Sequence, residues 1–250
     1  MKRRNRIRVG IVLIACVLAL AAGIGIGSVM ISPGDIFRIL GNKLFDLPLP
    51  ETLEASKVSI VWSIRLPRCL SAFLAGAALS ASGTVMQSVL RNSLASSYTL
   101  GVSSGASLGA ALVIVTGFAL PLAGVLTLPL SGFLFGLGTV LAVIAFAARM
   151  DRGLENQTII LTGMVFSLFV NACLTLVSVL HQNYMQQLIR WQMGSFSGNG
   201  WEEVLILAAV LAAGVLYLCC FTRQMDMMTF GEEPSHSGTC GLHQSRSRLR

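Results

Sequence analysis

Long stretches without a charged residue constrain this chain more than any other feature of its sequence. The longest covers residues 92–148, and four others cover residues 9–34, 69–90, 156–189 and 204–222. A helix needs about 20 mainly apolar residues to cross the hydrocarbon core of a bilayer, so each stretch is long enough to span a membrane. Only 12% of all residues are charged, about half the fraction found in soluble proteins, which excludes a single soluble core and a disordered chain.

The longest stretch is too long for one crossing, and it is interrupted near its middle. Pro121, Gly124 and Pro129 lie there, and such residues mark breaks between helices. Backbone groups inside a bilayer must be hydrogen-bonded within the protein, and the continuous apolar runs favour helices over a β-barrel. We therefore predict an all-α polytopic membrane protein with a transmembrane region at residues 1–230. Its six predicted helices cover about residues 9–31, 70–90, 100–117, 127–148, 158–180 and 204–221.

The positions of the charges predict how these helices are oriented. The net charge is +7, and the basic residues lie in short clusters between apolar runs, which indicates membrane topology rather than nucleic-acid binding. The cluster at residues 2–8 should stay in the cytoplasm, and alternation then places Trp62, Trp191 and Trp201 at the outer membrane surface as interfacial anchors. A cleaved signal peptide is the alternative. The first apolar stretch continues to Ile31, past any cleavage site near Ala21, so we predict an uncleaved first helix in the cytoplasmic membrane.

The sequence has none of the short motifs that would indicate an enzyme. There is no P-loop, no G-x-S-x-G and no H-E-x-x-H, so we predict neither catalysis nor a bound cofactor. The six cysteines and three histidines lack the clustered spacing of a metal site. The predicted spans contain essentially no ionisable residues, which argues against an ion-coupled pump. An unrelated six-helix channel or secondary transporter is the weakest alternative, because no convincing repeat relates the two halves of the chain.

Small residues recur at helix-packing intervals in the third predicted span. Gly101, Gly105 and Gly109 stand four residues apart, so they share one face of a helix. A face of small side chains lets two helix backbones approach closely in a membrane. We predict that this face packs against another helix, and generic packing in any helical bundle would give the same pattern.

An ordered series of short motifs lies at the ends of the predicted spans and between them. In chain order they are R-L-P-R at 65–68, M-Q-S-V-L-R-N-S-L-A at 86–95, L-G-V-S-S-G-A at 100–106, W-Q-M-G-S-F-S-G at 191–198 and F-G-E-E at 230–233. The series resembles the FecCD-type permease family, the membrane subunits of ABC importers for iron-siderophores, haem and cobalamin. The resemblance covers about residues 5–237, and it is specific because the motifs occur together and in order.

The resemblance implies an architecture and a set of partners. Permeases of this family have ten transmembrane helices, of which the six predicted here match the first six. They work as homodimers or heterodimers, two cytoplasmic ATPase subunits power them, and an extracytoplasmic substrate-binding protein delivers the cargo. The expected function is therefore a permease subunit that forms the pathway for an iron-siderophore, or for related haem or cobalamin cargo. The cargo itself is selected mostly by the binding protein.

The same resemblance implies roles for four polar residues. Arg65 and Arg68 would lie on the outer face and pair with acidic residues of the binding protein, since guanidinium forks fit carboxylates. The alternative is that both arginines anchor the helix at the lipid surface. Asn156 and Gln157 match the turn before the fifth helix, which narrows the cytoplasmic exit as a gate in similar permeases. An ordinary cytoplasmic turn is the alternative for that segment.

The last part of the chain combines a family motif with an atypical tail. Gly231, Glu232 and Glu233 match the start of the coupling helices, which rest on the ATPase and transmit its closure. Residues 234–250 are polar and basic, without apolar periodicity. We expect a shifted reading frame or an early stop here, and the alternative is a genuine ending that touches anionic lipid. A chain cut at this point would be a transport-incompetent fragment of such a permease.

Overall fold

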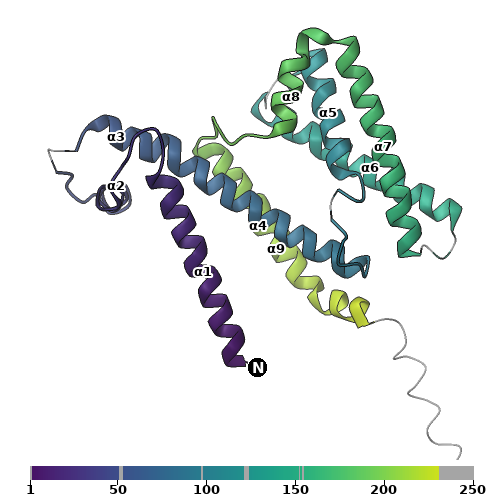
Figure 1. Ribbon diagram of the computed structural model, residues 1–250, viewed down its shortest axis with the longest axis horizontal. Helices are drawn as coiled ribbons and strands as arrows, with labels where there is room; N and C mark the ends of the chain where they lie inside the picture. Colours follow the sequence, from purple (N-terminus) through teal and green to yellow (C-terminus); the bar gives the residue numbers. More distant parts are fainter. Residues whose placement is uncertain are drawn as a thin grey trace, which may run out of the picture. The chain divides into compact units, whose positions relative to one another are not determined.

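The computed structural model describes residues 2–50, 53–96, 98–120, 124–151, 153 and 155–230, and all regular secondary structure within them is helical (Figure 1). Its α-helices are α1 (Lys2–Gly25), α2 (Pro33–Phe45), α3 (Ala55–Ser59), α4 (Leu66–Val89), α5 (Val102–Thr116), α6 (Thr127–Met150), α7 (Asn156–Leu180), α8 (Met185–Met193) and α9 (Trp201–Phe230). A π-helical turn, η1 (Ile60–Arg65), joins α3 to α4. Two 3-10 turns, η2 (Gly124–Leu126) and η3 (Gln182–Tyr184), precede α6 and α8.

Five helical segments among the described residues are long and apolar enough to cross a membrane. They cover Arg6–Gly25, Ala55–Val89, Thr127–Met150, Asn156–Leu180 and Trp201–Thr222, and α5 is a shorter apolar helix. Large apolar side chains on these segments are exposed, as at Leu168 and Leu216, which are each 70% exposed. Such exposure suits lipid contact rather than water. The prediction of an all-α, multi-pass membrane protein is confirmed.

The ends of three helices differ from the predicted ones. α1 stops at Gly25 instead of residue 31, because Gly27 and Ser28 follow and the capped helix α2 begins soon after. The second span begins at Ala55 instead of residue 70. α9 continues to Phe230 instead of residue 221. A charged residue ends an apolar stretch without ending a helix, so charge gaps locate spans better than they locate helix ends.

One compact unit comprises the described residues of Met1–Leu79 and Phe196–Leu216. Its buried core joins α1, α2 and the helix that begins at Ala55, through Ile24, Ile31, Ile36, Ile39, Val61 and Leu66. α2 was not predicted from the sequence, yet its signals are local. The Ser32 hydroxyl accepts a hydrogen bond from the backbone N–H of Asp35 at 3.1 Å, and Pro33 occupies the first turn.

The other compact unit comprises the described residues of Ser80–Ser195 and Tyr217–Arg250. Within it α5 packs along α6, and both helices contact α7. The short helix α8 contacts α5 and α7. Two buried clusters hold the unit together, one of Leu90, Ala95, Leu100 and Val143, and one of Ala111, Ile114, Leu174 and Leu188.

Candidate functional site

The two arginines of the R-L-P-R segment have different surroundings. The Arg65 guanidinium reaches the carboxyl end of α1, where Nη1 donates hydrogen bonds to the carbonyls of Ile24 at 2.8 Å and Gly25 at 3.1 Å. Its Nη2 donates to the carbonyl of Val29 at 2.5 Å. The last carbonyls of a helix have no partner within the helix, and a cation there also complements the helix dipole. Arg65 therefore satisfies the carboxyl end of α1.

Arg68 lies one turn further along the same helix, and its side chain is exposed. Among the described residues it makes no hydrogen bond or ion pair. Both arginines line a cavity of about 510 Å³ in the same compact unit. Its other lining residues include Gly27, Ser28, Cys69 and Phe196. Only one of the two guanidinium groups is therefore free to meet an acidic partner without breaking contacts within the chain.

Pro67 leaves a gap in the hydrogen bonding of this helix, and a tryptophan fills it. The backbone N–H of Leu66 donates to the carbonyl of Val61, five residues earlier, which is the π-helical pattern of η1. Pro67 has no N–H, so it cannot continue that pattern to the carbonyl of Trp62. The indole Nε1 of Trp201, at the start of α9, donates to this carbonyl at 3.1 Å. The rings of Trp62 and Trp201 also lie 4.8 Å apart.

The turn before α7 is organised by Asp151, a residue that sequence reasoning did not single out. Its carboxylate accepts hydrogen bonds from the backbone N–H groups of Gly153 and Glu155, each at 2.9 Å. These two bonds, with a third from the Thr158 hydroxyl, lower the pKa of Asp151 below its ordinary value. The usable signal was an Asp placed two residues before a Gly between two apolar runs, which is typical of an Asx turn.

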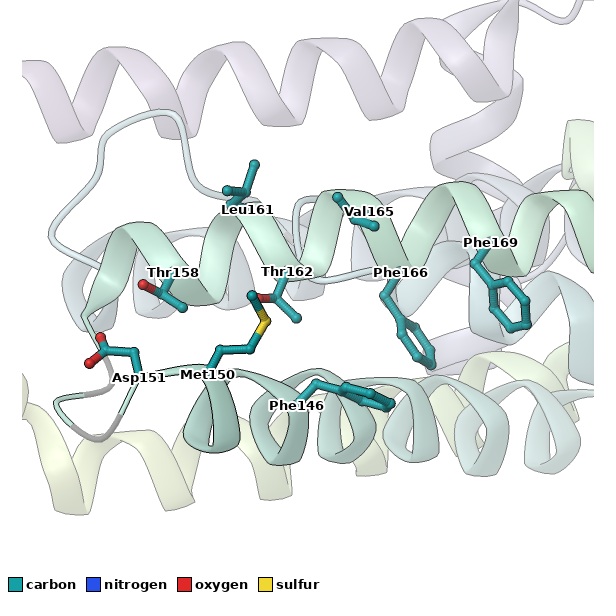
Figure 2. A pocket seen from close by; sticks show the side chains of 9 residues that line it. All are labelled: Phe146, Met150, Asp151, Thr158, Leu161, Thr162, Val165, Phe166 and Phe169. Atoms are coloured by element: carbon teal, nitrogen blue, oxygen red, sulfur yellow. The ribbon is translucent and has the colours of Figure 1, made fainter.

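The predicted gate residues occupy the first turn of α7. Asn156 is partly buried and Gln157 is exposed. Figure 2 shows the neighbouring groove, of about 660 Å³, which runs between α6 and α7 from Asp151 and Thr158 at one end to Phe169 at the other. Thr162 and five apolar side chains line the rest of the groove, the latter being Phe146, Met150, Leu161, Val165 and Phe166. Neither Asn156 nor Gln157 lines it.

Three glycines lie against α6, one at the N-cap of α5 and two within α5. Gly101 is the N-cap residue and has a φ of 75°, where a side chain is strained. A Cβ atom added at Gly105 would lie 2.8 Å from the carbonyl oxygen of Phe135, and one added at Gly109 would lie 2.7 Å from that of Ser131. Such distances are shorter than van der Waals contact. The backbones of α5 and α6 thus approach too closely for any side chain larger than hydrogen at these positions.

Within its described residues, the structure shows neither the predicted coupling segment nor a cluster of metal ligands. The coupling residues Gly231, Glu232 and Glu233 lie outside the described residues. No three His, Cys, Asp or Glu side chains within the described parts of the chain come together as metal ligands.

Comparison with known families decides the identity of this bundle. The model of the FecCD transport family matches residues 12–249 of the chain. The chain belongs to the FecCD transport family. The resemblance drawn from the ordered motifs is confirmed. The match also continues beyond Glu233 into residues 234–249, where we expected a departure from the family pattern.

Three curated relatives resemble this FecCD-family chain. The uncharacterized ABC transporter permease protein YvrB of Bacillus subtilis (strain 168) is 34% identical over 86% of this chain and 61% of its own length. The Fe(3+)-citrate import system permease protein YfmE of the same organism is 30% identical over 100% of this chain and 70% of its own length. The vitamin B12 import system permease protein BtuC of Serratia proteamaculans (strain 568) is 31% identical over 86% of this chain and 62% of its own length. The chain therefore spans 61–70% of the length of these relatives.

A solved structure resembles the fold of this chain. It is an inward-facing conformation of a metal-chelate type ABC transporter, and it superposes with a TM-score of 0.71. Its sequence is 26% identical, and the match covers 91% of this FecCD-family chain and 66% of the other. The helical fold of an ABC importer permease is thereby confirmed. The named cargoes of the relatives differ, so family membership alone leaves the cargo open.

Proposed function

We propose that this chain is a membrane-spanning permease subunit of an ATP-binding-cassette importer. The observation that carries the proposal is the family match over residues 12–249, together with the five membrane-length helices among the described residues. Relatives with this fold are named as permease proteins of import systems for ferric citrate and vitamin B12. The proposed cargo is an iron-siderophore complex, or a related haem or cobalamin molecule, carried across the cytoplasmic membrane.

The proposed partners follow from the family. They are a second permease subunit, identical or different, two cytoplasmic ATPase subunits that would contact Gly231–Glu233, and an extracytoplasmic substrate-binding protein. The chain carries no P-loop, so the nucleotide must bind elsewhere. The basic N-terminus would lie in the cytoplasm and the R-L-P-R segment on the outer face. The contact between the tilted rings of Trp62 and Trp201 supports a position of this segment at the membrane surface, since tryptophans concentrate there.

Arg68 is a better candidate than Arg65 for docking the binding protein. Asn156 and Gln157 are the candidates for the cytoplasmic gate. The exposed guanidinium of Arg68 can meet a carboxylate bidentately without losing a bond inside the chain. Asn156 and Gln157 contribute uncharged polar side chains at the start of a membrane-length helix, and the Asp151 carboxylate holds the preceding turn in place. An uncharged gate lets a cargo pass without binding it.

Uptake measurements test this function. Cells that express the chain from its own locus are given a panel of labelled cargoes: ferric siderophores, ferric citrate, haem and cobalamin. We expect one class to accumulate, and its uptake should stop when the P-loop lysine of the partner ATPase is replaced. Uptake that continues without ATP hydrolysis would instead identify a channel or a secondary transporter. Deletion of the binding protein should also abolish uptake at low cargo concentration.

A further inference from the structure

The R-L-P-R segment is a junction where two distant parts of the chain are tied to one helix. Arg65 bonds the backbone some 40 residues earlier, at Ile24, Gly25 and Val29. Trp201, which follows by more than a hundred residues, bonds the Trp62 carbonyl. Both ties lie in one compact unit, and both reach the helix within two turns of Arg68, at Trp62 and Arg65.

The Arg65 tie depends on a glycine that the motifs of the sequence do not include. A Cβ atom added at Gly27 would lie 2.5 Å from Nη2 of Arg65 and 2.8 Å from its Cζ. The guanidinium therefore lies directly over the backbone of Gly27, and a methyl group there would push it away. Arginine is flexible enough to move, but a displaced guanidinium could not reach the carbonyls of Ile24, Gly25 and Val29 together.

The Trp201 tie replaces a donor that the helix lacks. A buried or half-buried carbonyl without a partner costs free energy, and the proline leaves the Trp62 carbonyl short of a backbone donor. The indole supplies that donor and also buries its ring against Trp62. The start of α9 and the end of α1 therefore both contact the part of the Ala55–Val89 helix that lies around Trp62.

We propose that Arg65, Gly27 and Trp201 are positioning residues that hold the turn carrying Arg68, and that Arg68 alone presents the docking charge. This inference rests on the proposed docking function. Arg65 and Arg68 are three residues apart on one helix, so fixing the first guanidinium and the preceding π turn fixes the backbone turn from which the Arg68 side chain projects. Docking then meets a backbone turn that is already ordered, which reduces the entropy lost on binding.

The first test measures the junction itself, without a binding protein. The chain in lipid nanodiscs is compared with G27A, R65Q and W201F by hydrogen exchange of its backbone amides. Hydrogen bonds to charged groups are worth enough to slow local opening about tenfold, so G27A and R65Q should speed exchange at residues 24–31 by about that factor. W201F should speed exchange at residues 60–66. G10A is the control, because a Cβ atom at Gly10 has nothing within 4 Å.

The second test measures docking of the substrate-binding protein whose deletion abolishes uptake. Association and dissociation rates are recorded on the nanodiscs over a range of NaCl concentrations. G27A and W201F loosen the turn that carries Arg68, so they should raise the dissociation rate about tenfold. Both variants keep every charge, so the salt dependence of association should stay unchanged. R68Q removes the steering charge, so it should lower the association rate and flatten its salt dependence.

The outcomes separate the two proposals. Exchange that stays unchanged in both G27A and R65Q would overturn the Arg65 tie, and unchanged exchange in W201F would overturn the Trp201 tie. Normal docking in G27A and W201F despite faster exchange would overturn the positioning role. R68Q that docks normally would overturn the docking function, while the exchange results would still decide the ties. W201F tests the Trp201 tie independently of Gly27. The positioning role can therefore still be refuted if the G27A chain fails to fold.

Discussion

A methyl group at Gly105 should destabilise the bundle, although alanine favours a helix more than glycine does. In an open position the change from glycine to alanine stabilises a helix by about 0.5–1 kcal/mol. At Gly105 the new Cβ would lie 2.8 Å from the Phe135 carbonyl oxygen and 2.9 Å from the Thr139 Cβ. Both neighbours belong to α6, and one of them is backbone, so relief requires α5 and α6 to move apart. Overpacking of this kind costs about 1–3 kcal/mol.

The difference from a matched control isolates the packing cost. Gly138 lies on α6 one residue before Thr139, and a Cβ atom added there has nothing within 4 Å. G138A should therefore be neutral or stabilising. G105A should lower the free energy of unfolding by about 1–2 kcal/mol relative to wild type, after its helix-propensity gain is included. Removing the Thr139 hydroxyl, whose oxygen the new Cβ would also meet, in G105A/T139A should restore part of the loss, because the Phe135 carbonyl and the Cβ of residue 139 remain.

The assay is unfolding of the purified chain in mixed detergent micelles, followed by circular dichroism over a titration with a denaturing detergent. The midpoint of G105A should fall below those of both wild type and G138A. Equal midpoints for G105A and G138A would refute the reasoning. They would mean that α5 and α6 can separate at no cost, and that the glycine spacing does not hold the two helices together.

Three further predictions concern other parts of the chain. The pKa of Asp151 is lowered in the folded protein, so its stabilising effect on the α7 turn should be complete above about pH 4 and be lost as the pH falls below that value. D151N should therefore speed hydrogen exchange at residues 153–158 at pH 7. In acid, the exchange protection of wild type and D151N should become equal. Reporter fusions after Lys57 and Asn199 should be extracytoplasmic and those after Gly153 and Met225 cytoplasmic, and any inverted one would contradict the six-span topology. G163A should destabilise the bundle as G105A does, because its Cβ would lie 3.1 Å from the Leu100 Cα, whereas G83A, with open space around it, serves as its control in the same unfolding assay.

Charge gaps predicted the fold class because lipid imposes one strong rule on the sequence. A charged residue in the hydrocarbon core is costly, so its absence over a long stretch marks a span with few exceptions. The rule does not extend beyond the membrane surface. The helix of the second span begins at Ala55 and includes Lys57 and Arg65, and no rule about lipid could have found that start. α2 and α8 were missed for the same reason, since both are short helices of mixed polarity.

Local spacing predicted a packing face but not its partner. The glycines of α5 were found from their four-residue interval, and contact with α6 follows from the fold alone. The Asp151 turn was a local signal that we did not use. The bond from Trp201 to Trp62 had no local signal, because its acceptor is a backbone carbonyl and every residue has one.

The pair of arginines shows where sequence patterns lose their power to assign roles. Arg65 and Arg68 have the same side chain in the same motif, and a resemblance assigns them the same role. Their chemistry differs because α1 ends beside one of them and not the other. A guanidinium that already satisfies three carbonyls would have to break those bonds to dock, and that loss offsets the gain of a new ion pair. The exposed guanidinium has no such cost. The two positions should therefore respond differently to the same substitution, with R65Q acting on the helix end and R68Q on the partner.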